Sequence, residues 1–209
     1  MKYKLDLSSK LDLSASPITG APIGIALQPV QFLAWQPSTW PVAPTTVDEG
    51  FVFTLKRIFE DSILGEIANV ISDATKCNGD LQHRGHVVAI SLMCALDAIS
   101  AYGYRGKRGA HIRDFIANHF PVDYQQHAAD IYGFYRCSLV HCWNLFEASI
   151  YPGHERISST GGTLSFGLLN FFDALTGAAG NFLENLEFDA GLQTNTLDRY
   201  EGLRQSAKP

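Results

Sequence analysis

Apolar residues recur at three- and four-residue steps from residue 51 onward, which is the period of an amphipathic helix. Asp48 is a candidate N-cap for the first such segment, and Asn78-Gly79-Asp80 ends it. The apolar positions in between are Val52, Leu55, Phe59, Ile63, Ile67 and Val70. The pattern therefore predicts a long first helix with one buried face.

A second helix is predicted from about Gln82 to Tyr102. Nearly every position between Val87 and Ile99 is apolar or small, and Asp97 is the only charged residue there. A helix that is apolar all round is a central one. We expect Asp97 to have a partner, because burying an unpaired carboxylate is costly.

Further helices are predicted at about 111–120, 123–146 and 163–188, with a final amphipathic piece at about 194–205. Pro121 ends the third helix, and glycines and prolines between 150 and 162 predict a turn or hairpin there. The sum is an all-α bundle of four to five main helices joined by short loops.

Residues 1–50 differ from the rest and form a Pro-rich arm, with six of the nine prolines. Leucines alternate with polar residues at the start, at Leu5, Leu7, Leu11 and Leu13, which indicates short strands or an extended arm. The arm is also too apolar for a free linker, so we expect it to lie across the body or a second subunit. Disorder is the alternative. Residues 51–209 form the helical domain.

The net charge of −5 argues against a general nucleic-acid coat protein, which would be basic. The charged fraction of 18% is below the usual ~25% and predicts a surface partly covered by a partner, most simply in a homodimer.

The acidic net charge still allows a local basic patch. Its members are the candidate substrate-binding residues Arg105, Lys107, Arg108 and Arg113. A solvated loop is the alternative.

The four cysteines form no CxxC pair, and the chain starts without a secretory signal pattern. We therefore expect reduced thiols and a cytoplasmic protein.

Apolar runs are interrupted before the ~18 residues of a membrane span, so no membrane association is predicted. No metal or cofactor is predicted either.

Arginine and histidine separated by four to six residues can serve phosphodiester chemistry, and about one such match is expected by chance in this chain. Three occur: Arg105…His111, which crosses two glycines, Arg113…His119 and Arg136…His141. The last lies in an aromatic-rich helical segment and is favoured. Its members diverge by ~140° on a straight helix, so they could converge only near a helix end or across a two-fold axis. Alternatively, Arg136 pairs with Asp97 while His141 caps or packs.

The segment Ile131-Tyr-Gly-Phe-Tyr-Arg-Cys-Ser-Leu-Val-His141 resembles the last core helix of HEPN domains, and the resemblance covers roughly residues 51–188. It implies a helical dimer and, in active members, metal-independent RNA cleavage, by family analogy in a defence or toxin–antitoxin setting. His141 would serve as the general base or general acid for attack by the ribose 2′-hydroxyl, and Arg136 would stabilise the charge on the phosphorane. Asp97 would orient Arg136. Many members have a polar residue after the arginine, where this chain has Cys137.

Other interpretations stay open. A non-catalytic module that binds nucleotides or proteins also fits the acidic charge and the apolar arm. Cys137 and His141 share a helix face and could hold zinc with a distant Cys94 or His127, although no second local ligand pair is evident. A metal role is likewise open for His83 and His86.

Overall fold

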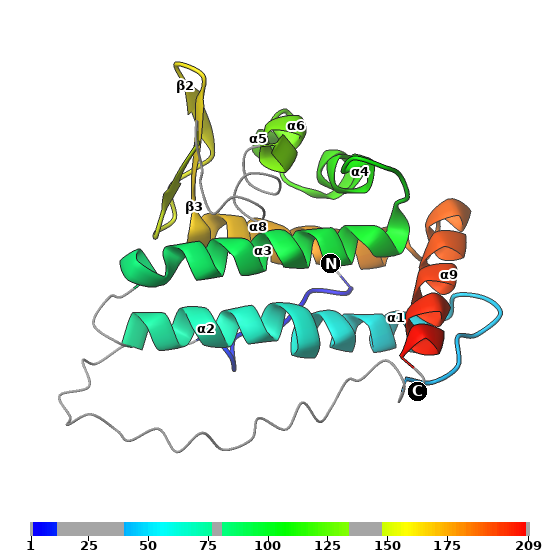
Figure 1. The fold of residues 1–209 in the computed structure, drawn as a ribbon. Helices are drawn as coiled ribbons and strands as arrows, with labels where there is room; N and C mark the ends of the chain where they lie inside the picture. The colour runs from blue at the N-terminus through cyan, green and yellow to red at the C-terminus, as the bar shows by residue number, and fades with distance from the viewer. Residues whose placement is uncertain (1, 12–39, 77–80, 134–147, 208–209) are drawn as a thin grey trace.

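The computed structural model describes residues 2–11, 40–76, 81–133 and 148–207 (Figure 1). Most of these residues are helical. The helices are α1 (Glu49–Arg57), the π-helical η2 (Ile58–Ile63), α2 (Leu64–Lys76), α3 (Leu81–Gly103), α4 (Ala110–His119), α5 (Val122–Gln125), α6 (Ala128–Asp130), α8 (Leu168–Asn185) and α9 (Ala190–Ser206). The strands are β1 (Ala148–Tyr151), β2 (Ser158–Thr160) and β3 (Thr163–Gly167).

The predicted first helix is one rod made of α1, η2 and α2. Asp48 caps it as expected, because its carboxylate accepts a hydrogen bond from the backbone N–H of Phe51 at 2.7 Å. The rod continues through η2 without a break, so the helical period read from the sequence is confirmed, with one wider turn inside it.

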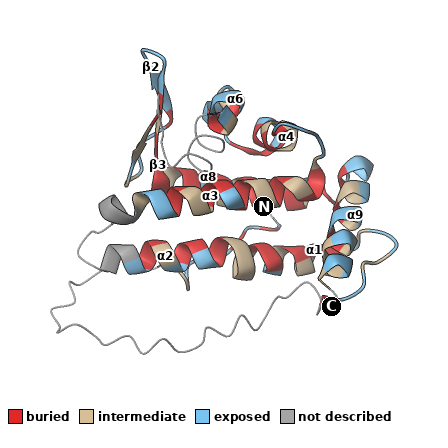
Figure 2. Ribbon diagram, in the orientation of Figure 1, coloured by how far each residue is buried: buried red, intermediate tan, exposed pale blue. Residues whose placement is uncertain are grey.

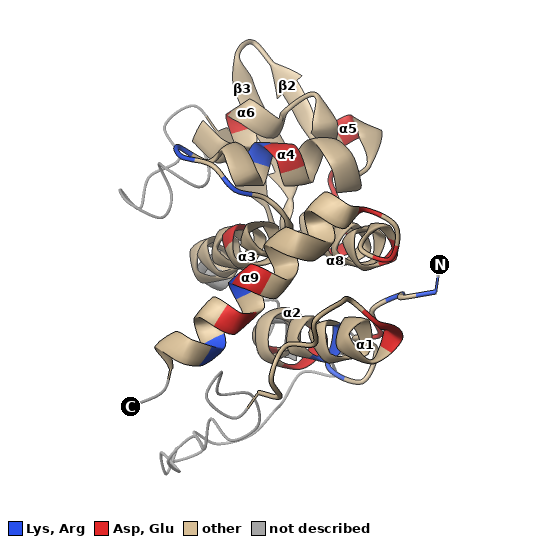
Figure 3. Cartoon of the chain, turned by 90° about the vertical axis from the view of Figure 1, so that its right-hand side faces the viewer, with Lys and Arg blue, Asp and Glu red and all other residues tan. Residues whose placement is uncertain are grey.

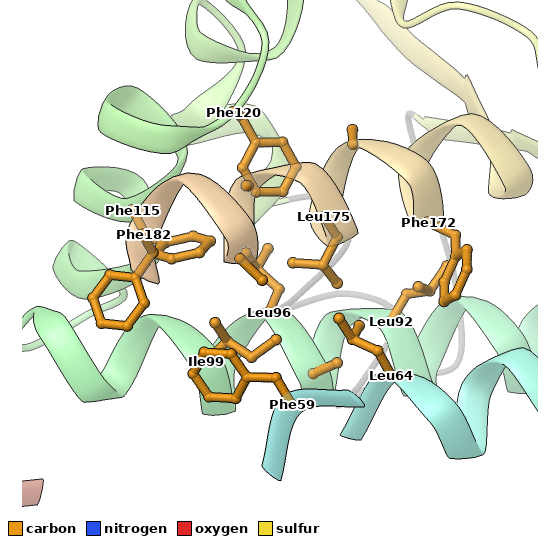
Figure 4. Packing of buried hydrophobic residues seen from close by; sticks show 14 of the residues in the cluster. Phe59, Leu64, Leu92, Leu96, Ile99, Phe115, Phe120, Phe172, Leu175 and Phe182 are labelled. Atoms are coloured by element: carbon orange, nitrogen blue, oxygen red, sulfur yellow. The ribbon is translucent and has the colours of Figure 1, made fainter. Parts of the chain in front are cut away.

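Helix α3 is the centre of the core and packs against α2, α4, α8 and α9. Leu92, Leu96 and Ile99 are fully buried between the rod and α8, facing residues such as Phe59 and Phe182 (Figures 2 and 4). Each buried side chain of this kind contributes about 2 kcal/mol of hydrophobic stabilisation. The prediction of a central helix is confirmed within one residue at each end.

Within the described residues, α3 is the one helix long and apolar enough to cross a membrane, over Gly85–Gly103 with a mean hydropathy of 1.5. Half of that stretch is buried inside the fold. The elements that pack on α3 are α2, α4, α8, α9 and β1.

The prediction of an all-α fold is wrong, because β1, β3 and β2 form a three-stranded mixed sheet in that order. β1 pairs with β3 in parallel, and β2 pairs with β3 as an antiparallel hairpin. Gly161 and Gly162 form its two-residue turn with φ values of 60° and 85°, which glycine adopts without strain. The sheet stands at one end of α8 (Figure 1).

Two of the predicted helices are longer than those in the structure. Residues 163–167 form β3 and not the start of α8, because buried Leu164 and Phe166 alternate with Thr163 and Ser165 in the period of a strand. The predicted helix at 123–146 begins instead as two short helices, α5 and α6, separated at Gln126 and His127. Its part from residue 134 onward lies outside the described residues.

The described start of the N-terminal arm lies in the core. Tyr3, Leu5 and Leu7 are buried while Lys4 and Asp6 between them are exposed, so the alternation in the sequence becomes an alternation of burial. No strand pairing accompanies it within residues 2–11. Farther along, Trp40 stacks on the ring of Tyr200 at 5.0 Å between centroids, which joins the end of the arm to α9.

The junction between β3 and α8 depends on Gly167. Its N–H donates to the carbonyl of Glu155 at 2.9 Å, and a Cβ placed on it would lie 2.3 Å from the carbonyl oxygen of Gly153. Gly177, in the middle of α8, has open space around the corresponding position.

We therefore expect Gly167→Ala to lower the free energy of unfolding by about 1–3 kcal/mol through overpacking. Gly177→Ala is the matched control, and it should raise that free energy by about 0.5–1 kcal/mol because alanine favours a helix interior. Urea denaturation of both variants measures this difference. Equal stabilities would contradict the close approach at Gly167.

Candidate functional site

The end of α3, the following loop and the start of α4 carry most of the predicted basic patch. The loop is tightly constrained, since Gly106, Arg108 and Gly109 have φ values of 143°, 55° and 74°. A Cβ on Gly109 would lie 2.0 Å from the ring of Tyr132. The glycines therefore fold the loop back on itself, so that α4 returns alongside α3.

A pocket of about 390 Å³ lies between this loop and α9. Its lining consists of Ala101, Tyr104, Arg105, Gly106, His111, Asn195, Asp198 and Arg199. We call it the His111 pocket. α3, α4 and α9 meet on the side that Figure 3 presents, where basic residues follow the loop and both signs of charge alternate on α9.

His111 and Asp97 form a bridge between α4 and α3. The Nε2 atom of His111 lies 2.8 Å from Oδ1 of Asp97, and both side chains are partly exposed, at 19% and 35%. A carboxylate on one ring nitrogen fixes the ring and its tautomer, which leaves Nδ1 as the nitrogen that can take a proton. The same arrangement orients a histidine in acid–base catalysis.

The charge of the His111 pocket comes mainly from two arginines and one aspartate. Arg105 is held by Asp198, with its guanidinium nitrogen 2.6 Å from the carboxylate oxygen, and both groups are mostly exposed. Arg199 lies on the same rim. Asn195 fixes α9 against the end of α3 by donating to the carbonyl of Gly103 at 2.8 Å. The pocket can thus bind an anion, with Asp198 competing for one of its arginines.

Only part of the predicted basic patch gathers at this pocket. Arg105 lines it, and Lys107 and Arg108 are exposed on the adjoining loop. Arg113 lies elsewhere, because its guanidinium donates to the Arg108 carbonyl at 2.8 Å and stacks over the ring of Tyr132. Its role there is to brace the loop.

Asp97 is partly exposed on α3, and within the described residues it has the expected partner in His111. Arg136 and His141 lie outside the described residues, so the predicted orientation of Arg136 by Asp97 stays a prediction. His111 was missed as a partner for Asp97. Fourteen residues separate the two, and only the glycine turn between them signals that the chain doubles back.

Arg113 and His119, another pair with the spacing of the motif, do not share a face of α4. His119 is only 2% exposed, with its Nε2 atom 2.8 Å from the Tyr104 hydroxyl and its Nδ1 atom 3.4 Å from the amide nitrogen of Asn185. A neutral ring fits these contacts, donating from Nε2 to Tyr104 and accepting at Nδ1. Burial lowers the pKa of His119 to about 4, and burial raises the pKa of Tyr104 to about 12.

Over the described residues, no group of three or more His, Cys, Asp or Glu side chains is placed to hold a metal ion. Comparisons of the chain with protein families, with characterised proteins and with solved structures find no match.

The neutral His119 predicts a loss of stability in acid. Its pKa is lower in the folded chain than in the unfolded chain, so the unfolded chain binds more protons between about pH 6.5 and pH 4. The free energy of unfolding should fall by about 2 kcal/mol from this group as the pH drops through that window.

The measurement is urea denaturation at pH 7 and near pH 4.5 for the wild type and for His119→Gln, which keeps a polar side chain but cannot be protonated. The variant should show a smaller acid-induced loss. An identical loss in both proteins would contradict a neutral, buried His119.

Proposed function

We propose that the chain binds single-stranded RNA and cleaves it without a metal ion, through attack of a ribose 2′-hydroxyl on the adjacent phosphate. The observation that carries the proposal is the His111 pocket, where a histidine oriented by Asp97 lies among arginines. The HEPN-like segment that ends at His141 supports the same chemistry.

The reaction needs a group that takes a proton from the 2′-hydroxyl and a group that gives one to the leaving 5′-oxygen. His111 suits one of these roles, because its Nε2 is held by a carboxylate and Nδ1 remains for proton transfer. His141 is the candidate for the other role on the grounds of the sequence motif. The proposal thus assigns one acid–base role to each of the two histidines.

Charge on the phosphate oxygens rises in the transition state, and a planar guanidinium can donate two hydrogen bonds to them. Arg199 and Arg105 are the candidates at the His111 pocket. A phosphate that displaces Asp198 from Arg105 replaces one exposed ion pair with another, at little electrostatic cost. Arg136 has the corresponding role in the sequence motif.

The test is cleavage of a single-stranded RNA in EDTA, with detection of products that end in a 2′,3′-cyclic phosphate. His111→Ala should lower the rate by about 100-fold or more, because a positioned acid–base group contributes at least that much. His141→Ala should lower it as well.

His154→Ala is the matched control, because His154 also pairs with a carboxylate, at 3.6 Å from Asp173, but lies outside the pocket. It should keep the wild-type rate. No cleavage by the wild type removes the enzyme proposal, and full activity of His111→Ala removes His111 from it.

A second candidate is a non-catalytic module that binds RNA or a nucleotide through the same pocket. The acidic net charge of −5 favours it, as does Cys137 directly after Arg136, where many active HEPN domains have a polar residue. In that case the wild type binds a labelled oligonucleotide and leaves it intact, and Arg199→Ala weakens the binding.

A further inference from the structure

A second pocket, of about 580 Å³, adjoins the His111 pocket, because Tyr104 lines both. It lies between α4 and the turn that connects α8 to α9. Besides Tyr104, the residues that matter here are Asn118, Asn185, Phe188 and Asp189. We call it the Phe188 pocket.

Phe188 is an aromatic side chain at the rim of this pocket and is 85% exposed. The turn that carries it is well braced. The Phe188 N–H donates to the carbonyl of Asn185 at 3.0 Å, and Gln193 donates to the carbonyls of Leu186 and Glu187 at 3.1 and 3.2 Å. On the other side, Lys2 and the Tyr3 hydroxyl hold the Glu187 carboxylate. A fixed backbone therefore presents an open ring face.

The polar groups of the Phe188 pocket suit a neutral, hydrogen-bonding ligand. Within the described residues, no protein hydrogen bond reaches the Oδ1 atoms of Asn118 and Asn185, whose amide nitrogens contact the Asp114 carbonyl and His119. The Tyr104 oxygen accepts from neutral His119, so its own proton is available to a ligand. The lining includes the carboxylate of Asp189 and no cation, which disfavours a phosphate.

We propose that the Phe188 pocket binds a nucleobase of the RNA whose phosphate occupies the His111 pocket. The base stacks on Phe188, and Asn118, Asn185 and Tyr104 hydrogen-bond to its edge. An exposed aromatic ring beside side-chain hydrogen-bonding groups is the arrangement with which proteins hold splayed-out bases of single strands. The inference rests on the proposed function, because the phosphate site is the neighbouring pocket.

The test compares two labelled probes of equal length and charge. One is a short 2′-O-methyl oligoadenylate, which cannot be cleaved through a 2′-hydroxyl, and the other is an abasic oligomer. The wild type should bind the oligoadenylate more tightly. Phe188→Ala should weaken its binding on the order of 10-fold, as loss of one stacked base does, and leave the abasic oligomer unaffected.

Phe188→Trp should retain the affinity for oligoadenylate, and Arg199→Ala should weaken both probes. Tyr151→Ala, a change at another exposed aromatic residue, should alter neither. If the wild type binds both probes equally, the base site is overturned while the phosphate site stands. If neither probe binds, the proposed function falls and this inference with it.

Discussion

The apolar surface of α3 is the constraint on which the rest of the structure depends. The rod, α4, α8 and α9 cover its buried face, while Val87 and Cys94 on the remaining face are exposed. Leu92, Leu96 and Ile99 exclude water completely. Because α4 must return along α3 and α9 must cross its end, their side chains converge where α3 stops. Both pockets lie where these side chains converge. The position of the site therefore follows from the way the other helices pack on α3.

Asp97 shows how the core and the site are connected. It is the only charge in the apolar stretch of α3, and its oxygen lies 2.8 Å from His111 on α4. An isolated carboxylate on such a helix would weaken the core, whereas a paired one joins two helices and orients an imidazole at a pocket. His119 likewise joins separate elements, because its two ring nitrogens contact Tyr104 in the α3–α4 loop and Asn185 in α8.

The sequence predicted the elements whose period is unambiguous. The all-round apolar run of α3 and the cap at Asp48 are confirmed. The sheet was missed because Leu164 and Leu168 are four residues apart and fit a helix, while the competing alternation of Leu164 with Phe166 is only five residues long. Gly161 and Gly162 indicated a turn or hairpin, and β2 and β3 form that hairpin, although the residues of β3 were assigned to a helix.

The pockets could not be predicted, because they depend on residues far apart in the chain. Arg105 and His111 matched the motif by spacing, and crossing two glycines counted against them. Those glycines are what lets the loop bring both residues to one pocket. Arg199 and Asp198, which come from α9 nearly a hundred residues later, have no local signature at all. Periodicity reports which face of a helix is buried and not which helices meet.

The contact of Lys2 and Tyr3 with Glu187 has a mechanical consequence. Glu187 precedes Phe188, and Leu5 and Leu7 anchor the same segment in the core. The first few residues therefore act as a latch on the α8–α9 turn. Binding of another macromolecule to these first residues would break their contacts with Glu187. The rim of the Phe188 pocket would then lose a support that comes from a part of the chain far away in sequence.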